Sequence, residues 1–315
     1  MKLIKRKVLT LSDRILKGLD ILLSSIYQSK YDKLTYNDLR PIFIVGVPRS
    51  GTTFISQIVF DLLLHKSYLS NFDNLFPRSK FISTFFKRRM PTKGFINSMS
   101  NYGKFKGLNS LSEGGNVWNY LCEDEVHSIS KLRSYVIQQC ILQKSIYFLN
   151  KNTYHIYRLD VLHRSFPNAF FIVVRRSPLD TALSLLKARS TYLKNENLWF
   201  GLKPVEFNEL KHLTPAEQCM GQVYHLNNAL HRGIEVANIP KENITYVDYE
   251  DALSSGTQMK DKFSSVLVTS LKNWDEQIEL RKNRTVLASR KKVNNNLYPE
   301  RILLAHKKFY ASSYR

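Results

Sequence analysis

The stretch that decides the fold is FIVGVPRSGTTF, residues 43–54. Its first half is an apolar run typical of a buried strand, and its second half becomes small and polar around Gly51. A strand that enters such a turn and then a helix presents consecutive backbone N–H groups beside a helix N-terminus, where anions bind. The common phosphate loop, G-x-x-x-x-G-K-[ST], has a lysine after its second glycine, whereas Thr52 and Thr53 follow Gly51 here. The stretch therefore predicts a phosphate site that lacks the lysine of ATP-dependent enzymes.

A second basic turn after a strand lies downstream, in FFIVVRRSPLDTALSLLKARS, residues 170–190. Arg176 ends the strand, and Ser184 follows two turns into a helix that begins with Ser177 as N-cap and Pro178 as first residue. Arg176 alone would be read as a surface charge. An Arg and a Ser that converge suit a phosphate, so the two turns together predict a site for two phosphates of one nucleotide.

The charge balance and cysteine content narrow the protein class. The chain has 315 residues, with 47 Lys and Arg against 26 Asp and Glu, so its net charge is 47 − 26 = +21. That charge attracts nucleotides, anionic glycans, nucleic acid or acidic lipid without selecting among them. Three scattered cysteines disfavour a disulfide scaffold or zinc site and favour a reducing compartment. We expect neither a transmembrane anchor nor a signal peptide, because no apolar run is long enough.

The order of elements predicts an α/β fold with three layers, a mostly parallel sheet flanked by helices. We expect one domain over residues 41–315, with an irregular, basic insertion at about 66–112 that serves as a binding lid. Expected strands are 41–47, 155–158, 169–175 and 244–247. Expected helices are 52–64, 117–149, 161–167, 177–190, 215–236, 259–272 and 299–310.

Residues 1–40 form a separate N-terminal extension. Apolar residues three or four apart predict an amphipathic helix over residues 8–26. Two readings stay open: this helix packs on the domain, or it lies on an anionic membrane.

PRSGTT after a strand, followed by R-x-P-x-D-x-x-x-S, resembles the sulfotransferases that use 3′-phosphoadenosine 5′-phosphosulfate (PAPS), over roughly residues 41–255. KNTYHIYRLDVLHRSFP (151–167) resembles their bacterial branch, although Thr153 stands where that branch commonly has proline, and YEDAL (249–253) resembles its late YEDL segment. The resemblance implies a P-loop NTPase-like architecture in which the first loop cradles the 5′-phosphosulfate and the later Arg and Ser bind the 3′-phosphate. The positions that match are Arg49, Ser50, Gly51, Thr52 and Thr53 for the first role, and Arg176 and Ser184 for the second.

The resemblance also implies a metal-free reaction that needs a general base. The missing lysine is then explained, because sulfuryl transfer leaves from a single 5′-phosphate and Arg49 can clamp it as a fixed cation. Our candidate base is Glu113 in LNSLSEGGNVW, although a carboxylate that only begins a helix or faces solvent remains an alternative. Weaker candidates are Asp73, His127 and His163, and Lys151 would add charge near the leaving group.

The acceptor is expected to be a hydroxyl of a carbohydrate or glycolipid, such as a lipid-linked saccharide. The basic cluster 87–89 would then face the acceptor from the insertion, and 290–292 would cap the nucleotide, although such clusters, like 307–308, are most often solvated. Two other functions stay open: an ATP- or GTP-dependent kinase with a degenerate loop, and a basic nucleic-acid-binding protein, which lacks a recognised motif. We expect a cytoplasmic protein in peripheral contact with the inner membrane face.

Overall fold

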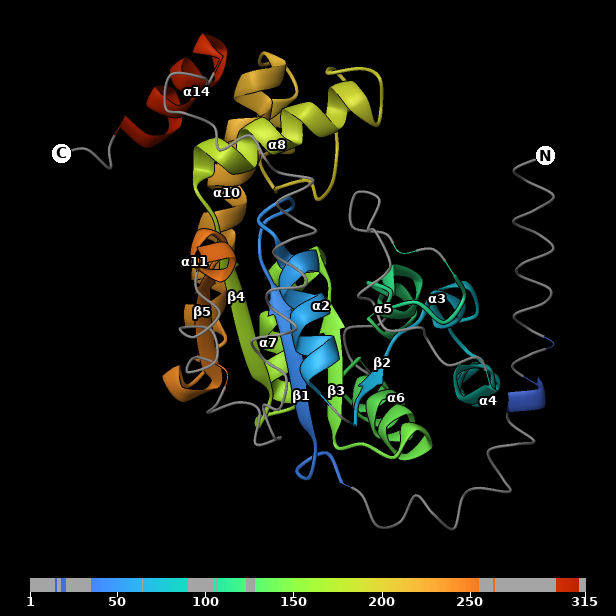
Figure 1. Ribbon diagram of the computed structural model, residues 1–315. Coiled ribbons are helices and arrows are strands. Elements are labelled where there is room, and N and C mark those ends of the chain that lie inside the picture. The colour runs from blue at the N-terminus through green and yellow to red at the C-terminus, as the bar shows by residue number, and fades with distance from the viewer. Residues whose placement is uncertain are drawn as a thin grey trace. The chain divides into compact units, whose positions relative to one another are not determined.

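The computed structural model of the chain describes residues 15, 18–20, 35–63, 65–89, 105, 107–122, 128–254, 263 and 299–311. Within them, five strands form one sheet in the order β2-β3-β1-β4-β5, flanked by helices (Figure 1). β3 pairs in parallel with both β1 and β2. The predicted α/β class, with a mostly parallel sheet, is thus confirmed. The strands are β1 (Arg40–Val45), β2 (Ser67–Tyr68), β3 (Tyr147–Lys151), β4 (Phe170–Arg175) and β5 (Ile244–Asp248).

The chain forms two compact units that interleave along the sequence. One comprises Met1–Ile44, Val59–Asn152 and Asp160–Phe171, and the other Val45–Ile58, Thr153–Leu159 and Ile172–Arg315. The helices, in chain order, are α2 (Thr52–Leu62), α3 (Asn71–Leu75), α4 (Lys80–Arg89), α5 (Gly115–Leu121), α6 (Ser128–Gln143), the 3-10 helix η3 (Thr153–Tyr157), α7 (Leu159–Ser165), α8 (Pro178–Thr191), α9 (Phe207–Leu210), α10 (Pro215–Val236), η4 (Lys241–Asn243), α11 (Tyr249–Ser254) and α14 (Glu300–Tyr310).

The core of the first unit surrounds Phe43 on the central strand β1. Five successive residues of that strand, 41–45, are buried, as expected for a parallel strand covered on both faces. The ring of Phe43 lies 5.7–6.4 Å, centroid to centroid, from four other aromatic rings, those of Trp118, Phe148, Phe166 and Phe171. Burial of these aromatic side chains is the main stabilising contribution here.

Most expected elements form where the periodicity places them. The strands expected at 41–47, 169–175 and 244–247 correspond to β1, β4 and β5, and the helices expected at 52–64, 161–167, 177–190, 215–236 and 299–310 correspond to α2, α7, α8, α10 and α14. α10 begins where it was expected because Thr214 accepts the N–H of Glu217 and the Glu217 carboxylate accepts the N–H of Thr214, which closes a capping box.

Three expectations about local structure were wrong. Residues 67–89 of the insertion are not irregular, because β2, α3 and α4 form there. The helix expected over 117–149 is instead α5 and α6 followed by strand β3, whose buried Phe148 and Leu149 pair with Pro41 and Ile42 of β1. The strand expected at 155–158 is the 3-10 helix η3 and the turn after it, in which the carbonyl of His155 accepts the N–H of Arg158 at 2.9 Å. The strand at this point of the sheet is β3, which ends just before this segment. Periodicity cannot show which of two adjacent short apolar segments forms the strand.

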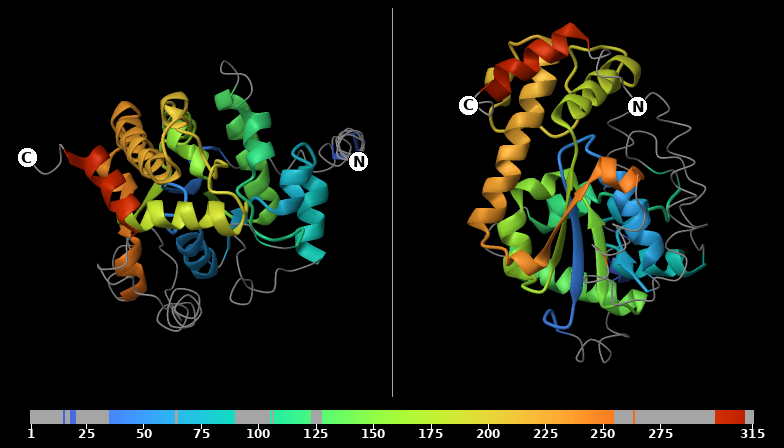
Figure 2. Two further views of the ribbon diagram at one scale, coloured as in Figure 1. Left: turned by 90° about the horizontal axis from the view of Figure 1, so that it is seen from above. Right: turned by 60° about the vertical axis from the view of Figure 1, so that its left-hand side comes forward.

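In the second unit, α8, α10 and α14 lie side by side (Figure 2). Two ion pairs attach α14: Lys308 to Glu217 at 2.7 Å, and Arg301 to Glu196 at 2.8 Å. The segment between α8 and α10 is therefore attached to α14 through Glu196.

The helix expected over residues 8–26 lies largely outside the described residues. The described part, residue 15 and residues 18–20, is helical. The carboxylate of Asp20 accepts three backbone N–H groups at the start of α4, those of Lys80, Phe81 and Ile82, at 2.7–3.3 Å. Asp20 thus acts as an N-cap from a distant segment. No helix among the described residues has the length and apolar character needed to cross a membrane.

Candidate functional site

The first turn, residues 46–51, connects β1 to α2. It lies in the second unit, which includes residues 45–58. The N–H of Ser50 donates to the carbonyl of Val47 at 3.0 Å, which closes the turn. Arg49 has a φ of 74° and Gly51 a φ of 99°. A left-handed conformation costs an arginine about 1 kcal/mol or more, and such strain is frequent at functional sites.

The turn packs closely against its surroundings and leaves one buried polar atom without a partner. A Cβ on Gly46 would lie 2.8 Å from both the Val174 carbonyl oxygen and the Ser50 Oγ, so only glycine fits there. Ser50 is 3% exposed, and its Oγ has no hydrogen-bond partner in the structure. A buried hydroxyl of this kind normally has a partner, and it lies at the N-terminus of α2, where Thr52 and Thr53 also present N–H groups. These donors suit an oxyanion.

The second turn, residues 175–177, contacts the first turn within the same unit. Arg49 donates from Nε to the Oγ of Ser184 at 3.1 Å, across 135 residues of sequence. Arg176 donates from Nη1 to the backbone carbonyl of Arg49, also at 3.1 Å. The buried Nε of Arg176 has no hydrogen-bond partner. The structure therefore brings together the residues that the sequence assigns to two phosphates, and it leaves donors on Ser50 and Arg176 for an anion.

Tyr249 is a residue of this site that the sequence analysis missed. The sequence analysis gave its YED segment only as part of the resemblance and no role in the site, yet the Tyr249 ring lies against Gly51: a Cβ on that glycine would be 2.2 Å from the tyrosine Cδ2. Burial raises the pKa of Tyr249, whereas the charges of Arg176 and Arg49 lower it. The signal that could have found it is a Tyr directly after a strand, at the same edge as the two basic turns.

The candidate base, Glu113, lies in the first unit and is paired with Lys151. The Lys151 ammonium both donates to the Glu113 carboxylate and forms an ion pair with it; the lysine side chain is 8% exposed and the glutamate side chain 38%. Asn152 donates to the backbone carbonyl of Glu113 at 3.0 Å. Lys151 ends β3 opposite Ile44, two residues before the first turn begins. Glu113 is therefore a half-exposed carboxylate held beside a buried cation.

The segment that carries Glu113 is fixed on both sides. Ser112 donates its N–H to the carbonyl of Leu69 at 2.8 Å. Asn150 accepts the indole N–H of the buried Trp118 at 3.0 Å and donates to the Ser112 carbonyl at 3.4 Å. Because these partners are buried, the position of Glu113 is set by the core of its unit.

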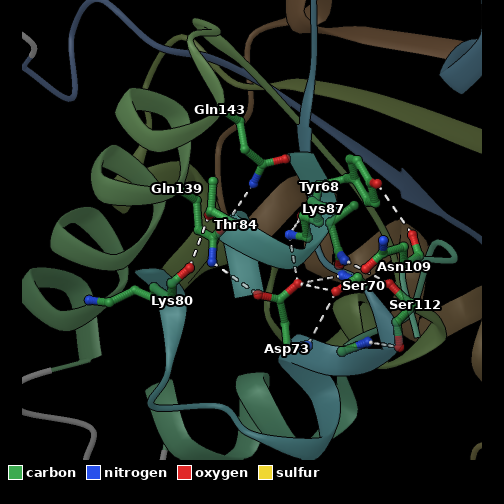
Figure 3. A network of polar contacts seen from close by, with 12 residues as sticks. Tyr68, Ser70, Asp73, Lys80, Thr84, Lys87, Asn109, Ser112, Gln139 and Gln143 are labelled. Atoms are coloured by element: carbon green, nitrogen blue, oxygen red, sulfur yellow. Dashed lines mark hydrogen bonds and ion pairs between the residues drawn. The ribbon is translucent and has the colours of Figure 1, made fainter. Parts of the chain in front are cut away.

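Asp73, a weaker candidate base, is buried in a polar network (Figure 3). Its Oδ2 lies 2.7 Å from the ammonium of Lys87, whose side chain is also buried. Ser70 donates to the same oxygen from both its N–H and its hydroxyl at 2.6 Å, and Gln139 donates to Oδ1 at 3.2 Å. Burial raises the pKa of Asp73, but the charge and hydrogen bonds of Lys87 outweigh it and hold that pKa below its usual value. Asp73 is thus poorly suited to accept a proton from a substrate.

The same network corrects the reading of the basic cluster 87–89. Lys87 is 8% exposed and donates to the carbonyl of Tyr68 at 2.7 Å, so its charge belongs to the interior and is not available to an acceptor. His163 lies on α7, and burial lowers its pKa despite the nearby Asp160. His127 and the cluster 290–292 lie outside the described residues. Among the residues that the structure describes, no three His, Cys, Asp or Glu side chains gather as metal ligands would.

Comparisons with known proteins agree with this geometry. The profile of the sulfotransferase family matches residues 41–259. Sulfotransferase STF9 from Mycobacterium avium has a similar fold, with a TM-score of 0.58 and 14% identity over 98% of this chain and 84% of that one. Sulfotransferase STF1 from Mycobacterium tuberculosis H37Rv gives a TM-score of 0.52 and 18% identity over 95% of this chain and 85% of that one. A search among curated proteins found no match. With a profile that spans most of the chain, from β1 through the first and second turns to β5, this protein belongs to the sulfotransferase family.

Proposed function

We propose that the protein transfers a sulfuryl group from PAPS to a hydroxyl of a carbohydrate or glycolipid. The observation that carries the choice of donor is that Arg49 of the first anion site contacts both Arg176 and Ser184 of the second. A donor with phosphates on both the 5′ and 3′ positions needs two such anion sites, whereas a nucleoside triphosphate needs only one continuous site.

In this proposal the two turns have separate tasks. The first turn binds the 5′-phosphosulfate with Arg49, the Ser50 hydroxyl and the N–H groups of Thr52 and Thr53, close to Gly51. The second turn binds the 3′-phosphate through Arg176, together with Ser184. Arg49 is always charged, so it stabilises the negative charge that develops on the leaving phosphate but does not donate a proton.

The chain's own acid–base chemistry centres on Glu113. The acceptor oxygen forms a bond to sulfur while the bond between sulfur and the bridging phosphate oxygen breaks. The hydroxyl proton passes to the Glu113 carboxylate, and 3′-phosphoadenosine 5′-phosphate (PAP) leaves with the bonding electrons. Lys151 adds positive charge beside this carboxylate. We expect no metal in this reaction, because a single phosphate leaves.

Contact with a membrane is a further part of the proposal. Residues 1–20 contain Lys2, Lys5, Arg6, Lys7, Arg14 and Lys17. While Asp20 faces α4, the apolar side chains of Ile15 and Leu19 are 60% and 48% exposed. A cytoplasmic enzyme that acts on a lipid-linked saccharide would use such a basic, apolar segment at the inner membrane face. Binding of the full chain to vesicles with 30% anionic lipid, but not to neutral vesicles, and its loss on Ile15→Ser with Leu19→Ser, would support this contact.

Thermal unfolding with ligands tests the donor. PAP is expected to raise the unfolding midpoint more than ATP with Mg²⁺ or a DNA oligomer does, because a ligand that binds only the folded state stabilises it. Arg176→Ala and Ser184→Ala should weaken PAP binding, by about tenfold or more for the charged residue. Arg164→Ala is the matched control, because the side chain of this arginine is exposed and pairs with Asp160 on its own helix. Equal stabilisation by ATP with Mg²⁺ would overturn the choice of PAPS.

Turnover tests the base. Glu113→Gln keeps the shape of the side chain but removes its basicity, so PAP binding should stay within about twofold while turnover falls by 10²-fold or more. Glu235→Gln, at an exposed position of α10, controls for the change in charge. An active Glu113→Gln enzyme would show that another group takes the proton.

A further inference from the structure

In the second unit, the residues at the end of β4 contact those at the end of β5. The second turn (residues 175–177) begins with the last residue of β4, and residues 248–250, here called the third turn, are the last residue of β5 and the first two of α11. Each residue of one turn contacts the residue at the same position of the other. The contacts are Arg175 with Asp248, Arg176 with Tyr249, and Ser177 with Glu250.

The two outer contacts hold the backbones of these turns together. Arg175 donates from Nε and Nη2 to the two carboxylate oxygens of Asp248 at 2.9 and 2.7 Å, which is a bidentate pair. At the other end, the N–H of Ser177 donates to Glu250 Oε1 at 3.3 Å. A bidentate pair fixes orientation as well as distance, so the central residues of the turns are held face to face.

The central contact places the Tyr249 ring between the two phosphate turns. The guanidinium carbon of Arg176 lies over the ring at 4.7 Å from its centroid. Gly51 of the first turn approaches the ring so closely that a Cβ there would lie 2.2 Å from Cδ2. Phe54, on α2, packs edge-on against the ring at 5.8 Å and 81°. One aromatic ring therefore contacts the first turn, the helix that it begins and the arginine of the second turn.

The position of Arg176 follows from these contacts. Its flat guanidinium lies on the Tyr249 ring, its Nη1 donates to the carbonyl of Arg49, and its Nε lies 4.0 Å from the Glu250 carboxylate. A long side chain that is held before its ligand arrives loses less rotamer entropy on binding. The cation–π contact is the part of this support that depends on an aromatic ring.

We propose that Tyr249 is a positioning residue that holds Arg176 in place for the 3′-phosphate and sets it relative to the first turn. This inference rests on the proposed function, in which Arg176 binds that phosphate. It assigns to the YED segment a role in discriminating a nucleotide with a 3′-phosphate from one without it.

The experiment compares the binding of PAP and AMP, which differ by the 3′-phosphate, by calorimetry on the full chain. In Tyr249→Leu and Tyr249→Met we expect PAP to bind about 5- to 30-fold more weakly and AMP to change by less than about threefold. Methionine fills much of the space without an aromatic face, so comparing Tyr249→Met with the wild type separates cation–π support from packing. Tyr249→Phe keeps the ring and should bind PAP within about twofold of the wild type. In an Arg176→Ala background, Tyr249→Met should change PAP affinity by less than about threefold.

The outcomes separate this inference from the proposed function. If the wild-type chain binds PAP no better than AMP, the proposed function fails. If the wild type prefers PAP but the Leu and Met variants keep the same PAP-to-AMP ratio, the positioning role of Tyr249 fails and the proposed function stands. A loss of the same size for both nucleotides, or the same loss in Tyr249→Phe, would also refute it, because a merely structural tyrosine behaves in that way.

Discussion

Replacing Lys87 by methionine tests the buried ion pair that organises the insertion. Asp73 and Lys87 lie 2.7 Å apart with side chains 1% and 5% exposed, respectively. Lys87→Met removes the cation and keeps most of the aliphatic stem, so the change isolates the charge. The Asp73 carboxylate keeps its donors Ser70 and Gln139 but loses its counter-ion. We expect this variant to be strongly destabilised at neutral pH.

The magnitude follows from the burial of both partners. Breaking a buried pair by removing one member costs about 3–5 kcal/mol, because a buried charge is left uncompensated. In the wild type, Lys87 holds the pKa of Asp73 below its usual value, so this contribution is present above pH 3.8 and is lost as the pH falls through the lowered pKa. Without Lys87, burial dominates and raises that pKa, so the folded variant takes up a proton more readily. The gap between wild type and variant should therefore be largest at pH 7 and narrow toward pH 4.

The assay is urea unfolding followed by circular dichroism at pH 7 and pH 4.5, on the wild type, Lys87→Met, and the double variant with Asp73→Asn. The double variant has no charge at either position of this pair and should be more stable than Lys87→Met at pH 7. A Lys87→Met protein within about 1 kcal/mol of wild type at pH 7 would refute the reasoning. A double variant less stable than the single one would refute it as well.

Two further stability predictions concern positions with defined surroundings. Gly51→Ala places a Cβ against the Tyr249 ring at a φ of 99°. We expect the free energy of unfolding to fall by about 2 kcal/mol or more and PAP to bind more weakly. Gly18→Ala is the control, because nothing lies within 4 Å of a Cβ at that position, and equal effects of the two substitutions would contradict the argument. Burial raises the pKa of Asp20 to about 6, so its ionisation lowers the stability of the fold as the pH rises from about 4 to 6. Asn cannot ionise, so Asp20→Asn should lose that part of the pH dependence. The measurement compares unfolding midpoints at pH 4 and 7. An unchanged pH dependence in Asp20→Asn would show that another group titrates.

Elements whose signals are local were predictable. β1, the first turn and α2 follow from an apolar run, a small polar turn and a helix start within residues 41–62. α8 has its cap at Ser177 and α10 at Thr214, each a hydroxyl residue directly before a proline. In these cases neighbouring residues supply both the pattern and the hydrogen bonds, so no distant partner is needed.

Elements that depend on distant partners were not predictable. Strand β3, YFLNK, is too short for its periodicity to decide, and it becomes a strand because β1 and β2 pair with it on both sides. The order inside the insertion rests on the Asp73–Lys87 pair and on contacts of Asp73 with Ser70, the N-cap of its own helix, and with Gln139 of α6. A cluster of basic residues in the sequence cannot reveal that one of them is buried.

For the site, the sequence predicted which groups bind anions. PRSGTT after a strand, with an arginine and a serine at a later strand end and helix, specifies backbone and side-chain donors for two anions, because these donors come from local turns and helix N-termini. How those donors combine depends on contacts between distant parts of the chain. It places Arg49 on Ser184 across 135 residues, pairs Glu113 with Lys151, and sets Tyr249 between the turns, because these contacts form only when parallel strands align their carboxyl ends.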